Sequence, residues 1–89
     1  MPPEWLKQQL TVDEAESAHQ VSDERLGPGP VPFGFMNRDW RALLAQMREG
    51  DEFWEFCSPP ESWEHLAGRE GIALVREGKV IGTILTLMN

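Results

Sequence analysis

The chain has 89 residues, of which 40% are hydrophobic and 26% charged, a composition that fits one small globular domain. Fifteen acidic residues against eight lysines and arginines give a net charge of −7, which argues against binding to nucleic acid or to an anionic membrane. No apolar run has the length of a transmembrane helix, and the first residues lack the pattern of a signal peptide. Because the single cysteine, Cys57, excludes an intramolecular disulfide, we expect a cytoplasmic protein. Paired Cys-x-x-Cys spacings and phosphate-binding glycine motifs are absent, so we expect no metal or cofactor.

Residues 1–26 predict an N-terminal arm that is helical or partly disordered. Thr11 and Glu14 have the spacing of a capping box, which indicates a helix over residues 12–25. A short apolar stripe precedes this box and consists of Trp5, Leu6 and Leu10. The residues after it carry only small apolar side chains, so the helix has little area to bury. We therefore expect the arm to dock on the rest of the chain or on a second copy.

Glycine and proline alternate with apolar residues over 27–36, the segment that follows the arm. Proline fixes φ and lacks a backbone donor, so neither a helix nor a central strand can run through this segment. The sequence predicts an extended connector, followed by a compact α+β domain over residues 37–89.

A helix is predicted over residues 38–49. Asn37 is a good N-cap, and Asp39 lies in the first turn, where the helix dipole favours an anion. Apolar side chains at helical spacing form one face, made of Trp40, Leu43, Leu44 and Met47. Gly50 is placed to end this helix as its C′ residue.

An aromatic-rich strand is predicted over residues 51–57, with aromatic side chains on both faces. Ser58 and Glu61 have the spacing of a second capping box, which predicts a short helix over residues 60–67, closed by Gly68.

Two strands over residues 71–76 and 79–87 flank the dipeptide Glu77-Gly78, which predicts a tight β-hairpin. Gly82 within the second strand indicates a bulge or a close backbone approach. The predicted fold class is α+β, with one antiparallel three-stranded sheet and the helix 38–49 packed on one face. An uncovered edge of this sheet offers a route to a homodimer.

The stretch from Trp54 to Ile81 resembles small bacterial proteins of unknown function. The shared pattern runs from Trp54-Glu55-Phe56-Cys57 through Ser58-Pro59-Pro60-Glu61-Ser62-Trp63 to Ala73-Leu74-Val75-Arg76-Glu77-Gly78-Lys79-Val80-Ile81. The resemblance covers roughly the C-terminal half and implies a bacterial domain, without an activity or a catalytic residue.

Three groups of residues could carry chemistry, and each has a structural alternative. Cys57 precedes a predicted helix and could act as a nucleophile with His65 as its base, although a buried cysteine and a surface histidine are the simpler interpretation. Glu61 and His65 could share a metal, but the third ligand that a site needs is missing. An acidic corner at the helix-to-strand turn consists of Glu49, Asp51, Glu52 and Glu55. It could perform acid–base chemistry or bind calcium, or it could stay solvated or dock a basic partner.

Aromatic side chains outside the predicted core, together with a nearby arginine, are the remaining signal. Such residues are typical anchors of protein interfaces. The candidates are Trp5, Phe33, Phe35, Trp63 and Arg69, and Phe33 and Phe35 could instead fold back on the sheet. The sequence favours a non-enzymatic protein-interaction or accessory module, binding a protein partner or itself. The alternative is a small enzyme or ligand-binding protein that uses Cys57 and His65 or the acidic corner.

Overall fold

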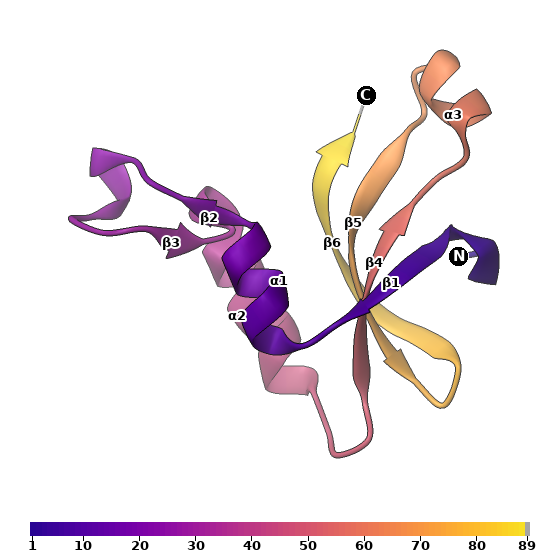
Figure 1. The fold of residues 1–89 in the computed structure, drawn as a ribbon, viewed down its shortest axis with the longest axis horizontal. Coiled ribbons are helices and arrows are strands. Elements are labelled where there is room, and N and C mark those ends of the chain that lie inside the picture. The colour runs from indigo at the N-terminus through magenta and orange to yellow at the C-terminus, as the bar shows by residue number, and fades with distance from the viewer. Residues whose placement is uncertain (89) are drawn as a thin grey trace.

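The computed structural model describes residues 1–88 and has an α+β fold (Figure 1). Its main sheet has four antiparallel strands in the order β1-β4-β5-β6, and a second sheet pairs β2 with β3. The strands are β1 (Leu6–Leu10), β2 (Gln20–Val21), β3 (Val31–Pro32), β4 (Glu52–Cys57), β5 (Arg69–Arg76) and β6 (Lys79–Met88). The α-helices are α1 (Val12–Ala18), α2 (Asn37–Gln46) and α3 (Pro60–Glu64). Short 3-10 turns lie at Pro3–Trp5, Glu24–Leu26 and Gly34–Met36.

The hairpin of β5 and β6 is confirmed as an antiparallel pair. Glu77 and Gly78 both have positive φ, 51° and 78°, the backbone that a tight two-residue hairpin turn requires. Gly82 is confirmed as a position of close approach, because a Cβ there would lie 2.7 Å from Cδ1 of Leu43 on α2. The pairing register also shifts next to Gly82, between Leu74 and Val75.

The N-terminal segment differs from its prediction, because residues 6–10 form strand β1 instead of a helix. β1 pairs antiparallel with β4 and adds a fourth strand to the predicted three. The apolar residues Leu6 and Leu10 pack on opposite faces of the sheet, with a register shift between Leu6 and Gln8. Packing of both leucines against the sheet therefore outweighs the weak helical spacing of this stretch.

Helix α1 begins at the predicted capping box, in which Thr11 Oγ1 accepts from the Glu14 backbone and Glu14 Oε1 accepts from the Thr11 backbone. It ends at Ala18, well short of the predicted residue 25. The chain instead forms β2, whose partner β3 lies in the predicted connector. The connector is thus not extended throughout, since its last residues form a 3-10 turn that leads directly into α2.

Helix α2 covers the predicted segment but is shorter at its C-terminal end. Asn37 lies inside the helix, and its side-chain Nδ2 donates to the Pro32 carbonyl instead of capping. Gly50 is not the C′ residue. The helix ends at Gln46, where the Gln46 carbonyl accepts from Arg76 and the Arg48 N–H donates to Asp51. These bonds hold the turn that leads into β4.

The short helix α3 ends at Glu64 rather than at residue 67, and Ser58 does not cap it. The buried Ser58 Oγ instead accepts from Ser62 Oγ at 2.6 Å and from the Arg69 N–H at 2.9 Å. Ser58 therefore joins the two ends of the loop that connects β4 with β5.

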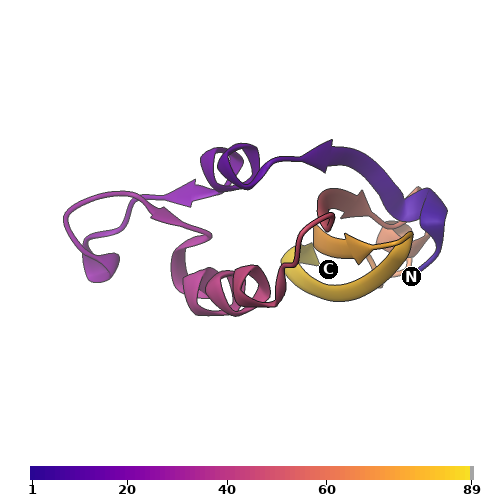
Figure 2. The ribbon, with the colours of Figure 1, turned by 90° about the horizontal axis from the view of Figure 1, so that it is seen from below.

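The sheet carries apolar side chains on both faces. Both α1 and α2 lie on one side of the curved sheet, α1 near β1 and α2 near β6 (Figure 2). The larger core lies between them and the sheet and contains Ala15, Phe33, Trp40, Leu43, Phe53, Ile72, Leu74 and Ile84. A smaller core on the other face contains Phe56, Ala73 and Val75, packed against Trp5, Leu6, Trp54, Val80 and Leu85.

Trp40 is the centre of the larger core and is fully buried. Its ring lies 4.5 Å from that of Phe33 and 5.0 Å from that of Phe53, and its Nε1 donates to Glu16 Oε2 at 2.8 Å. His19 stacks on the far side of Phe33 at 4.8 Å. One side chain therefore joins α1, α2, β4 and the segment before α2.

No helix within residues 1–88 is long and apolar enough to cross a bilayer.

The substitution Trp40→Phe is expected to lower the free energy of unfolding by about 1–3 kcal/mol, because it removes the bond to Glu16 and leaves a void. Arg41→Ala, at an exposed site on the same helix, should change it by less than about 0.5 kcal/mol. Urea unfolding followed by circular dichroism measures both. Equal effects of the two substitutions would contradict the central role of Trp40.

Candidate functional site

Strand β6 forms one edge of the main sheet, and only its β5 side is paired within residues 1–88. Unpaired edges are normally protected by charges, proline, bulges or short length. β6 spans Lys79–Met88, contains no proline, and has Lys79 as its single charged residue. Register shifts occur at both edges, one in the pairing of β1 and two in the pairing of β6, but β1 is only five residues long and contains Lys7. β6 is therefore the less protected edge.

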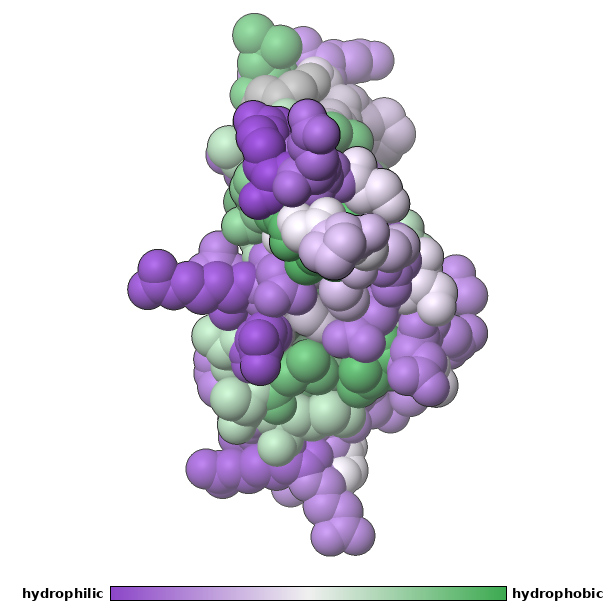
Figure 3. Space-filling model, turned by 90° about the vertical axis from the view of Figure 1, so that its left-hand side faces the viewer, coloured by the Kyte–Doolittle hydropathy of each residue, from purple (hydrophilic) through white to green (hydrophobic). Residues whose placement is uncertain are grey.

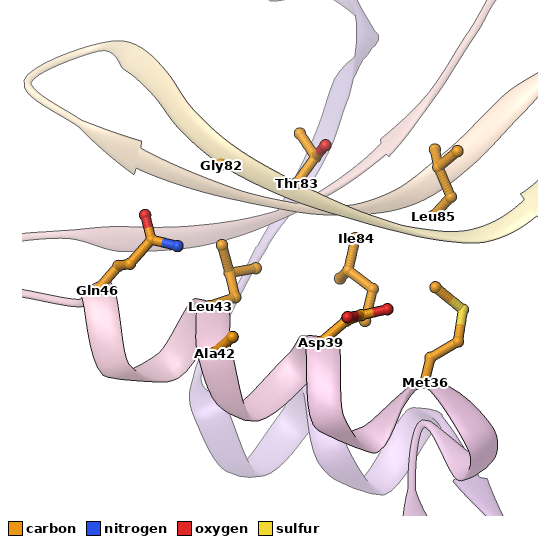
Figure 4. A pocket seen from close by; sticks show the side chains of 9 residues that line it. All are labelled: Met36, Asp39, Ala42, Leu43, Gln46, Gly82, Thr83, Ile84 and Leu85. Carbon is orange, nitrogen blue, oxygen red and sulfur yellow. The ribbon is translucent and has the colours of Figure 1, made fainter.

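A groove of about 340 Å³ runs along β6, between this strand and helix α2 (Figure 4). Its lining residues are Met36, Asp39, Ala42, Leu43 and Gln46 from the helix side and Gly82, Thr83, Ile84 and Leu85 from the strand. Gln46 lies towards Gly82, whereas Met36 lies towards Leu85, so the helix and the strand run in opposite directions. The groove thus combines a free strand edge with a helical wall.

The pleat of β6 assigns its side chains to two faces. Ile84 points towards α2 and is buried in the larger core, whereas Thr83 and Leu85 point away from the helix (Figure 4). Thr83 is exposed to solvent. At Gly82 the strand has no side chain, which allows Leu43 to approach and leaves space beside Gln46.

The groove is almost uncharged, because Asp39 is its one charged lining residue. Across residues 1–88, the side chains of Asp39 and Gln46 are both exposed and neither forms a hydrogen bond. A carboxylate acceptor and an amide donor are thus available at two separate positions on the helical wall. Apolar surface continues along the strand, since Leu87 and Met88 are 55% and 60% exposed.

The five predicted interface residues do not gather at one place. Phe33 is buried in the larger core, so it cannot serve as an exposed anchor. Its neighbour Phe35 is 63% exposed and lies under the Arg25 guanidinium, 5.0 Å from the ring centre. Trp5 is half-buried against the smaller core.

On the side of the molecule that presents β2 and β3, hydrophilic side chains project between areas of apolar surface (Figure 3).

Trp63 and Arg69 do lie together, at the loop between α3 and β5. The Trp63 ring occupies the space that a side chain at Gly68 would need, and Trp63 Nε1 donates to the Ser58 carbonyl. Arg69 donates to the Gly68 carbonyl. Both residues are half-buried, and their contacts order this loop.

The two residues proposed as a nucleophile and its base are not joined in the structure. Cys57 is half-buried, and its Sγ donates to the Ser58 carbonyl rather than contacting His65, which is exposed. No group of three or more histidine, cysteine, aspartate or glutamate side chains among residues 1–88 could hold a metal ion.

The acidic corner is divided by its own contacts. Glu52 accepts from Trp54 Nε1, while Asp51 forms two hydrogen bonds with Arg76, at 2.9 and 2.7 Å. The bonds from Arg76 lower the pKa of Asp51 against the opposing effect of desolvation, and the Arg48 N–H adds to the lowering. The same pair raises the pKa of Arg76. Asp51 therefore fixes the turn between α2 and β4.

Sequence reasoning anticipated an uncovered sheet edge but missed the groove beside it. The lack of charge in Lys79–Met88 was a usable signal, because a solvent-facing edge strand normally carries more charge. The position of α2 along β6 depends on contacts such as Gly82 with Leu43, which the local pattern does not specify.

Removal of the Asp51 carboxylate should lower the free energy of unfolding only at pH values at which the carboxylate is charged. Because folding lowers its pKa, its contribution to stability is present above the unfolded pKa of about 3.9 and disappears as the pH falls through the folded value. Asp51→Asn is therefore expected to be destabilising at neutral pH, and its difference from the wild type should shrink below about pH 4. Urea titrations across this range measure it, with the exposed Glu64→Gln as control. A difference that stays constant in acid would contradict this account.

Phe33 and Phe35, two residues apart, should differ strongly in the stability lost on truncation. Phe33→Ala is expected to destabilise the fold by about 3–5 kcal/mol, because it removes the ring between His19 and Trp40. Phe35→Ala should change stability by less than about 0.5 kcal/mol. Thermal unfolding distinguishes the two, and similar losses would show that the exposed ring also supports the core.

Comparisons with known proteins give no relative from which the role of this site could be inferred. No family model, no curated protein and no solved structure matches the chain. The free edge of β6 and the groove beside it therefore carry the functional argument.

Proposed function

We propose that this protein is a non-enzymatic protein-interaction module that binds through the free edge of β6. The observation that carries the proposal is the combination of a ten-residue edge strand, nearly free of charge, with a groove against α2. A strand added to such an edge forms backbone hydrogen bonds with it, and contacts between its side chains and the helical wall make the binding specific.

The geometry suits an extended polypeptide better than a small molecule. Small ligands are usually held in concave pockets with several converging polar groups. Here the groove is open and elongated along the strand, and only Asp39 and Gln46 offer polar side chains from the helix. Backbone N–H and C=O groups on the outer side of β6 are the larger source of hydrogen bonds.

The charges of the chain favour a protein partner over a nucleic acid. The net charge of −7 opposes a polyanion, and the groove itself carries no basic side chain. The enzyme alternative gains no support from Cys57, because its thiol donates to the Ser58 backbone carbonyl rather than to His65.

A photo-crosslinking residue placed at Thr83 tests this proposal in the cells that produce the protein. Thr83 is exposed on β6, so the probe should form a discrete crosslinked product with whatever pairs with this edge. The matched control is Gln9, which lies in the same cross-strand row through Trp54 and Ala73 but on the opposite edge. Absence of any product at Thr83, or equal products at both positions, would contradict binding at β6.

A further inference from the structure

We infer that the strand that pairs with β6 is β6 of a second copy of this chain, running antiparallel about a two-fold axis at Thr83. This inference rests on the proposed function and names its partner. The pair would join two four-stranded sheets into one continuous sheet, with both α2 helices on the same face.

The position of the axis follows from the pleat. When two identical edges pair antiparallel about an axis perpendicular to the sheet, residues that lie opposite each other point to the same face. An axis at Thr83 places Thr83 opposite its own counterpart and Gly82 opposite Ile84 of the second copy. The strands then overlap from Lys79 to Leu87, with Gly82–Ile84 as the regularly paired centre. One register shift of β6 lies on each side of this centre, so the two offsets cancel and Lys79 still falls opposite Leu87.

The helical wall is complementary to itself in this arrangement. Along the groove, Asp39 lies near Ile84 and Gln46 lies near Gly82 (Figure 4). Reversal of one copy about Thr83 therefore brings Asp39 of each chain towards Gln46 of the other. A carboxylate meets an amide donor, and neither side chain forms a hydrogen bond within residues 1–88 of one chain.

Small and uncharged residues at the centre of the dimer contact allow the two copies to come close. Ala42 lies between Asp39 and Gln46 on the groove side of α2, and its methyl group suits the 8–10 Å spacing of packed helices. Each copy carries a net charge of −7, so any close contact must avoid adding like charges. The β6 edge meets this condition, because its single charge, Lys79, lies at the strand end.

The exposed apolar C-terminal end of β6 would also be covered by the second copy. In the same register Leu87 lies opposite Lys79 of the second copy, whose aliphatic stem can pack over an apolar side chain. Leu87 and Met88 are among the most exposed apolar side chains of the described residues. Dimerisation would thus protect the one long unguarded edge from unspecific association.

Charge exchange at Thr83 tests the arrangement directly. Light scattering after size-exclusion chromatography should give the wild type twice the 10.1 kDa mass of one chain. Thr83→Lys and Thr83→Glu should each raise the dissociation constant at least about tenfold, because like charges then face each other across the axis. An equimolar mixture of the two variants should recover the dimer, since opposite charges pair. Circular dichroism of each variant checks that it remains folded, so that a lost dimer is not read from an unfolded chain.

Two further comparisons keep the test specific. Gln9→Lys and Gln9→Glu, at the same row of the opposite edge, should leave the dimer unchanged. Gln46→Lys should tighten it, because the new cation faces Asp39 of the second copy. A wild type that stays monomeric up to millimolar concentration, or a mixture that fails to recover the dimer, would overturn the inference. If the monomer nevertheless crosslinks another protein at Thr83, the dimer is wrong and the proposed function stands.

Discussion

The packing of Trp40 is the interaction on which the rest of this fold depends. Its ring is held between Phe33 and Phe53, and its indole nitrogen donates to Glu16. Segments far apart in the chain therefore meet on one side chain, and the chain achieves this without a disulfide. Because α2 carries Trp40, the same packing fixes the helix beside β6 and so determines the width of the groove. The candidate site is in this sense a consequence of the core.

Local signals predicted the elements whose energetics are local. The capping box at Thr11 and the turn at Glu77-Gly78 depend on neighbouring residues, and both form as expected. The amphipathic face of α2 was also readable, because its period matches the helix it forms. The α+β class followed from these elements.

Long-range packing decided the features that the sequence did not predict. Strand β1 forms because Leu6 and Leu10 find opposite faces of a sheet whose other strands lie far away in sequence. Ser58 looked like a helix cap, but its hydroxyl accepts from the Arg69 N–H, eleven residues on. The candidate site shows the same division, since the low charge of the strand was visible in the sequence and its helical wall was not.

The distance along the chain between β1 and its partner has a consequence for the order of folding. Strands β5 and β6 meet through a two-residue turn, and β4 joins β5 across the connection that contains α3. Pairing of β1 with β4 spans a much longer stretch of chain, from Leu10 to Phe53. Closing a long loop costs more entropy than closing a short one. The three-stranded meander should therefore assemble first, and β1 should dock late on a surface already formed. Until β1 docks, β4 is also an unpaired edge strand. A partly folded chain therefore exposes two edges that can pair with another chain, β4 and β6, whereas the folded chain exposes one long edge, β6.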